Sequence, residues 1–150
     1  MFAYRGYQNI DYSQPTIIRA QTEAGGIVEC KFFLEPKLNI TILKQYLQEV
    51  NCQQIENVII VGKQILPCNS SKTTRANENV EIFTVDELQL NVMEHVYQPK
   101  FEKVTNTEQL APFQWSIMLQ DDRVAKFMRY KRGDIIRITR DGALYYRIVL

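Results

Sequence analysis

The fold is decided by the stretch DRVAKFMRYKRGDIIRI, residues 122–138, which combines a helix start, a turn and a strand. An aspartate, Asp121 or Asp122, stands where its side-chain oxygen can cap the first turn of a helix. Residues 123–128 then place three apolar side chains on one helical face. We therefore expect a short helix that packs on a core.

A β-hairpin is predicted to follow this helix. Residues 131–134 are expected to turn, and residues 135–139 alternate apolar and polar side chains, as a half-buried strand does. Asp141-Gly142 is a strong signal for a type I′ turn, because that turn needs positive φ at both central positions. Residues 143–150 then return as the second strand.

Positive charge is concentrated in the same region. From Arg123 to Leu150 there are eight basic and two acidic residues, whereas the whole chain carries a net charge of only +1. Ile136 and Ile138 share one face of the predicted strand, so Arg137 points to the other. Arginines mounted on rigid elements are typical of partner-binding surfaces. We assign partner binding to seven basic residues: Arg123, Lys126, Arg129, Lys131, Arg132, Arg137 and Arg147.

These residues also lie near aromatic side chains, a pattern that fits contact with nucleic-acid backbone and base stacking. Guanidinium groups bind phosphate and carboxylate equally well, so the sequence does not choose between a nucleic acid and an acidic protein surface.

The N-terminal part predicts a small α/β layer. Strands are expected at residues 26–34, 57–62 and 81–85, and the second is apolar enough for a parallel strand buried on both faces. Apolar residues recur at helical spacing over residues 40–50, with Asn39 placed as the N-cap.

The remaining segments are less regular. The polar residues 69–79 can hold a further helix, and residues 88–99 look extended. Residues 99–114 are expected to be a polar connection broken at Pro112, with the module boundary at about residues 86–100.

Composition excludes several classes of protein. The chain has 150 residues, 45% of them apolar and 23% charged, which is ordinary globular composition. No apolar run approaches the ~18 residues of a membrane-spanning helix, and the N-terminus does not read as a secretory signal.

Cys30, Cys52 and Cys68 lack metal-ligand or disulfide spacing, so we expect reduced thiols in an intracellular compartment. The single histidine, His95, limits triad chemistry to one position, and a structural role is favoured for it.

Two acidic motifs raise the question of a metal. Glu29-Cys30-Lys31 has the acid-x-lysine pattern of a class of Mg²⁺-dependent nucleases, in which a strand presents both side chains on one face. That class also needs an upstream aspartate, and Asp11 is the only candidate. Asp121-Asp122 could ligate a metal, but a helix cap explains the pair without one.

Residues 122–138 resemble the signature of the H-type RNA polymerase subunits, Asp-Pro-Val-Ala-Arg-Tyr-Tyr-Gly-Leu-Lys-Arg-Gly-Gln-Val-Val-Lys-Ile. This family includes the archaeal H-type polypeptide and the larger eukaryotic subunit shared by nuclear RNA polymerases I, II and III. Upstream, LNVMEHVYQPK (residues 90–100) is similar to the family's Val-Asn-Ile-Thr-Glu-His-x-Leu-Val-Pro-Lys, and residues 145–149 resemble its Thr-Tyr-Arg terminus. Residues 33–40 and 57–61 look like elements of the eukaryotic jaw module, which archaeal members lack.

The resemblance implies the architecture. An α/β jaw-like module with a small, mostly parallel sheet and helices would span residues 1–90, with residues 1–25 unassigned. An α+β assembly module with a terminal β-hairpin would span residues 91–150. Two departures stand out: Arg123 replaces a proline, and Arg129 replaces a glycine. If that glycine holds a left-handed helix cap, arginine costs about 1 kcal/mol there, so we expect a rebuilt helix end.

The resemblance also implies a non-catalytic structural subunit of a multisubunit DNA-directed RNA polymerase. The assembly module would dock on the largest subunit, and the jaw would lie near downstream DNA. No cofactor, metal, membrane or small-molecule substrate is expected. A short, divergent member suggests a large DNA virus, acting in host cytoplasm and virion, or a divergent eukaryote, acting in the nucleus. The alternatives are a Mg²⁺-dependent nuclease of the acid-x-lysine class and a free-standing nucleic-acid-binding module.

Overall fold

The computed structural model describes residues 1–53, 55–64, 77–105 and 115–150. The chain forms two compact units, Phe2–Leu90 and Asn91–Leu150, each with its own sheet. The first unit contains, in chain order, the 3-10 helix η1 (Ala3–Arg5), β1 (Gln8–Gln14), β2 (Ile17–Gln21), β3 (Ile27–Phe33), α1 (Ile40–Cys52), β4 (Asn57–Gly62), β5 (Val80–Thr84) and α3 (Val85–Gln89). The second contains the 3-10 helix η2 (Val92–Glu94), β6 (Lys100–Lys103), β7 (Ser116–Met118), α4 (Arg123–Met128), β8 (Ile135–Arg140) and β9 (Ala143–Val149).

The first sheet is mixed, with the strand order β1-β2-β3-β4-β5. β1, β2 and β3 pair antiparallel, whereas β3, β4 and β5 pair parallel. The expectation of a mostly parallel sheet is therefore wrong, because residues 1–25, unassigned from the sequence, supply an antiparallel hairpin. All six residues of β4 are buried, as predicted for a central parallel strand.

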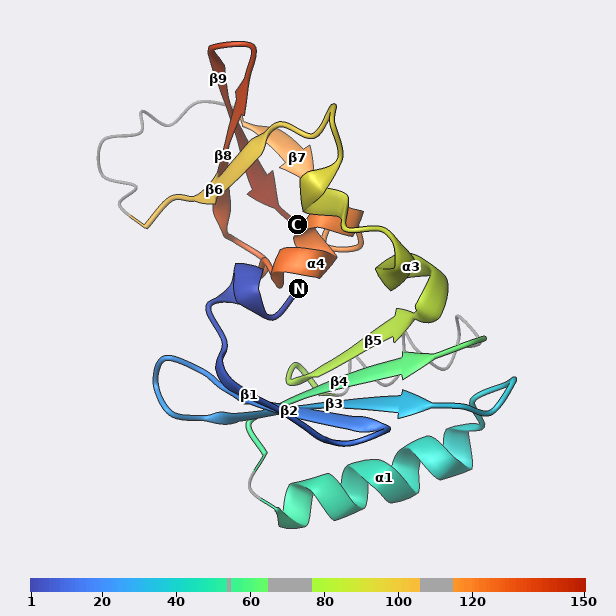
Figure 1. Cartoon of the computed structure of the whole chain (residues 1–150). Helices are drawn as coiled ribbons and strands as arrows, with labels where there is room; N and C mark the ends of the chain where they lie inside the picture. Colours follow the sequence, from blue (N-terminus) through green and yellow to red (C-terminus); the bar gives the residue numbers. More distant parts are fainter. Residues whose placement is uncertain (54, 65–76, 106–114) are drawn as a thin grey trace. The chain divides into compact units, whose positions relative to one another are not determined.

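Helix α1 covers one face of this sheet (Figure 1). It begins where predicted, because the Asn39 side chain accepts a hydrogen bond from the Thr41 N–H at 3.2 Å. Its apolar positions Leu43, Tyr46 and Val50 are buried in one core with strand residues that include Ile60. Helical spacing of apolar residues thus determines which side of α1 meets the sheet.

The second sheet has the strand order β6-β8-β9-β7. β8 pairs antiparallel with β6 and β9, and the short β7 runs parallel to β9. The predicted type I′ hairpin is confirmed by positive φ at Asp141 (50°) and Gly142 (81°). Ile136 and Ile138 of β8 and Val149 of β9 share one core with Val124 and Ala125 of α4. This unit is the α+β fold expected from residues 122–150.

Two expectations for the middle of the chain are wrong, and one strand was missed. Residues 88–99 are not extended throughout, because α3 runs to Gln89 and η2 follows at Val92. The stretch from residue 99 is not only a connection, because it contains β6. β7 was not predicted at all. Most of the possible helix at residues 69–79, together with Pro112, lies outside the described residues.

Candidate partner-binding surface

Helix α4 is fixed at its start by Asp122. The Asp122 Oδ1 atom accepts hydrogen bonds from the N–H groups of Val124, at 2.8 Å, and Ala125, at 3.5 Å. Of the two candidate aspartates, Asp122 is therefore the cap. The cap accounts for the position of Asp122 without a metal and fixes the start of α4 immediately before Arg123.

The end of α4 is closed by Arg129 in the left-handed conformation, with φ of 59° and ψ of 43°. The Arg129 N–H donates to the Lys126 carbonyl at 3.2 Å, and the Tyr130 N–H donates to the Ala125 carbonyl at 2.8 Å. These bonds satisfy carbonyls that the helix leaves open, in the arrangement that usually favours glycine. The expectation of a rebuilt helix end is thus wrong: arginine occupies the left-handed position itself.

The turn after α4 is held by Asp134. Its two carboxylate oxygens each lie 2.8 Å from a nitrogen, one the Lys131 backbone N–H and the other the Lys103 ammonium. The Lys131 and Arg132 side chains are exposed on this turn. Their backbone is thereby held by the carboxylate while their charges face solvent.

Arg137 and Arg147 lie on opposite faces of the second sheet. Arg147 pairs in register with Ile136, so its side chain shares the face of the buried isoleucines, whereas Arg137 pairs with Tyr146. Arg137 forms an ion pair with Glu102 of β6, to which Lys100 also binds at 2.7 Å. Hydrogen bonds from Lys100 and then Arg137 lower the pKa of Glu102 to about 2. The seven assigned residues therefore do not form a single patch, and Arg137 already has an acidic partner within the unit.

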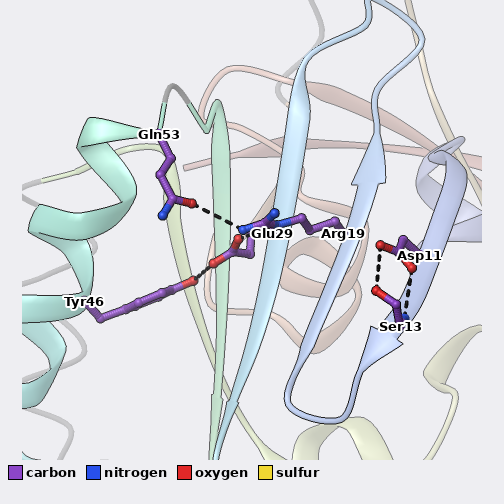
Figure 2. Close-up of polar contacts among 6 residues, drawn as sticks. All are labelled: Asp11, Ser13, Arg19, Glu29, Tyr46 and Gln53. Carbon is purple, nitrogen blue, oxygen red and sulfur yellow. Dashed lines mark hydrogen bonds and ion pairs between the residues drawn. The ribbon is translucent and has the colours of Figure 1, made fainter.

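The acid-x-lysine motif lies on β3, and both oxygens of its Glu29 carboxylate accept hydrogen bonds (Figure 2). Glu29 is 2% exposed. Its Oε1 atom accepts the Tyr46 hydroxyl of α1 at 2.6 Å, and its Oε2 atom binds the Arg19 Nε atom of β2 at 2.8 Å. Burial and the hydrogen bond to Glu29 raise the pKa of Tyr46. Gln53 accepts from the Arg19 guanidinium at 3.3 Å and extends this network.

The described residues around Glu29 do not supply the partners of a nuclease site. Lys31 shares the Glu29 face of β3, but its ammonium lies 4.3 Å from the centre of the Tyr46 ring. Asp11 accepts hydrogen bonds from the backbone and hydroxyl of Ser13, and in Figure 2 it turns toward Ser13 rather than Glu29. Within the described ranges, no group of three or more His, Cys, Asp or Glu side chains could hold a metal ion. Both charged side chains of the motif thus contact other residues of the first unit.

The remaining candidate residues also have local roles. His95 is exposed, and its Nδ1 atom accepts a hydrogen bond from the Tyr97 N–H at 3.3 Å. Cys30 is buried, and burial raises the pKa of its thiol to about 12, so it stays protonated at neutral pH. Among the helices of the described segments, none has the length and hydropathy to cross a membrane.

Sequence reasoning missed two ion pairs, Arg5–Glu81, whose side chains are largely buried, and Arg19–Glu29, in which only the glutamate is buried. The sequence shows only spacing along the chain, whereas Arg19 meets Glu29 through the pairing of β2 with β3, and Arg5 of η1 meets Glu81 of β5 across 76 residues. Helix α3 could have been found, because Thr84-Val85-Asp86-Glu87 has the Thr-x-x-Glu pattern of a capping box. The structure contains that box, with the Thr84 N–H bound to Glu87 at 2.7 Å.

Comparison with known proteins finds a family that the second unit resembles. Residues 90–149 match the family model described as RNA polymerase Rpb5, C-terminal domain. In this domain the chain is similar to the Rpb5 family, the H-type RNA polymerase subunits. A protein of Invertebrate iridescent virus 6, named "Putative DNA-directed RNA polymerase subunit 454R", is 25% identical in an alignment that covers 99% of this chain and 94% of that protein.

The Rpb5 match contains every one of the seven assigned basic residues. It begins at Leu90, next to the start of the second unit, and includes α4, its two caps and the hairpin. The similarity to the viral protein extends through the first unit as well. The match to the Rpb5 domain and the similarity to the viral protein support a role in transcription by a DNA-directed RNA polymerase.

Proposed function

We propose that this chain is a non-catalytic structural subunit of a multisubunit DNA-directed RNA polymerase. The observation that carries the proposal is the match of residues 90–149, the whole second unit save its last residue, to the Rpb5 C-terminal domain. The Glu29 carboxylate is bound by Arg19 and Tyr46, which supports a structural subunit rather than a nuclease. Catalysis then belongs to the other subunits of the complex.

In this proposal the second unit is the assembly module and docks on the largest polymerase subunit. Arg123, Lys131, Arg132 and Arg147 are exposed on its surface and can bind carboxylates of that subunit. The first unit is the jaw and lies near downstream DNA. The similarity to a viral protein favours a large DNA virus, with transcription in host cytoplasm and packaging in the virion; a cellular chain would act in the nucleus.

Copurification from the native source tests this proposal. The tagged chain is expected to retain both large polymerase subunits in equal amounts through a moderate-salt wash. Recovery of the chain alone would contradict it. Binding to DNA that weakens linearly with the logarithm of salt concentration would then favour the free-standing nucleic-acid-binding module.

A further inference from the structure

The second sheet has an apolar side that its own core does not use. Along β9, Leu144, Tyr146 and Ile148 alternate with residues of the opposite face. Ile148 pairs in register with Ile117 of the neighbouring strand β7. These side chains lie on the face of Arg137, because Arg137 pairs with Tyr146.

Beyond the ends of β7 and β9, the same apolar side gains one further pair of residues. The Leu150 N–H donates to the Met118 carbonyl, and the Gln120 N–H donates to the Leu150 carbonyl, both at 3.0 Å. This is the parallel ladder pattern that places Leu150 beside Leu119. We call the resulting surface the outer face, and it consists of Ile117, Leu119, Leu144, Tyr146, Ile148 and Leu150.

The outer face is exposed to an extent that is unusual for apolar residues in a sheet. Leu119 is 67% exposed, Ile117 57%, Leu144 56% and Leu150 43%. A sheet with its core on one side normally carries polar residues on the other. Here the core with α4 uses Ile136, Ile138, Met118 and Val149, which point the opposite way. Contiguous exposed apolar surface of this kind marks an interaction site.

Charge selects the kind of partner. On the side of β6 and β8 the outer face is bordered by Arg137, Glu102 and the 72% exposed Lys100, so this border carries net positive charge. A second copy that docked through the same face would bring the same positive border, so like charges would meet. We propose that the outer face binds another subunit of the polymerase, through an apolar surface bordered by acidic residues. This inference rests on the proposed function and names a docking surface distinct from the exposed arginines.

The test compares two charge-matched double variants, each tagged in the native source. Ile117→Lys/Leu119→Lys places two charges on the outer face at positions more than half exposed, so folding is expected to persist. Leu34→Lys/Leu90→Lys is the control, because Leu34 is 78% and Leu90 75% exposed in the first unit. We expect the first variant to retain about ten-fold less polymerase than the wild type, and the control to retain wild-type amounts. Leu144→Ala, which removes contact area without adding charge, should give a smaller loss in the same direction.

Each other outcome overturns a different statement. Wild-type recovery of polymerase by Ile117→Lys/Leu119→Lys, with unchanged circular dichroism and melting temperature, would overturn the outer face as a docking surface. A wild-type chain that sediments as a dimer, and a variant that sediments as a monomer, would make a second copy the occupant and overturn the polymerase subunit. If the wild type retains no polymerase subunit, the proposed function itself fails.

Discussion

The Arg5 guanidinium and the Glu81 carboxylate are joined by two parallel hydrogen bonds, of 2.9 Å and 2.7 Å, between side chains that are 2% and 13% exposed. The pair links η1 to β5 across 76 residues of sequence. Such a two-pronged pair combines charge with fixed geometry. The pair therefore binds the segment before β1 to β5, the strand at the opposite edge of the first sheet.

Removal of Arg5 is expected to lower stability strongly. Arg5→Ala leaves the largely buried Glu81 carboxylate without this partner, and breaking a buried ion pair in this way costs about 3–5 kcal/mol. Urea denaturation followed by circular dichroism measures the loss. Arg140→Ala, at an exposed position of the hairpin, is the control and should leave the free energy of unfolding nearly unchanged. Equal effects of the two substitutions would show that burial of the Arg5 pair does not matter.

Arg129 allows a cleaner test of backbone strain. Arg129→Gly and Arg129→Ala both remove the side-chain contacts, but only glycine adopts the left-handed conformation without a steric cost. We expect the glycine variant to be more stable than the alanine variant by about 1 kcal/mol, measured as the difference in thermal or urea unfolding. Equal stabilities of the two variants would mean that α4 ends in another conformation.

Glu102 is expected to give the fold an acid-sensitive contribution. Its pKa is lowered in the folded protein from 4.5 to about 2, first by Lys100 and then by Arg137. The stabilisation from its charged form is therefore complete above pH 4.5 and is lost as the pH falls through about 2. Carboxyl-detected NMR should show the low pKa in the wild type and a pKa nearer 4.5 in Lys100→Met and Arg137→Gln. A wild-type pKa at the ordinary value for glutamate would contradict the ion pairs.

Arg132 is the sharpest test of docking through the basic turn. Arg132→Glu reverses an exposed charge on the turn held by Asp134, so the fold should be unchanged while retention of the large subunits falls several-fold. Arg140→Glu, on the hairpin and outside the seven assigned residues, is the matched control. Retention at the wild-type level by Arg132→Glu would remove Arg132 from the docking surface.

Local signals in the sequence predicted much of the fold. Asn39, Asp122 and Asp141-Gly142 each act through the backbone within a few residues, so their caps and turn could be read directly. β4 was recognised because burial on both faces leaves a continuous apolar run. The hairpin β1–β2 was missed because its first strand is polar and largely exposed. Such a strand has no alternation of apolar and polar side chains by which it could be recognised.

The candidate surface was only partly predictable. The outward direction of Arg137 follows from strand alternation, but its pairing with Glu102 depends on the register of β6, a strand that was not predicted. The outer face was missed for the same reason, since Ile117 and Leu119 meet Ile148 and Leu150 only through β7. Strand register over long sequence separations is set by tertiary packing rather than by local pattern.

The irregular pairing of β1 affects how this edge of the first sheet can pair with another molecule. β1 is an edge strand, and its register with β2 shifts twice, between Gln8 and Asp11 and again between Asp11 and Gln14. A regular edge would template the backbone of another molecule, whereas a strand interrupted in this way offers no continuous row of donors and acceptors. The β1 border is therefore a poor template for the growth of an intermolecular sheet.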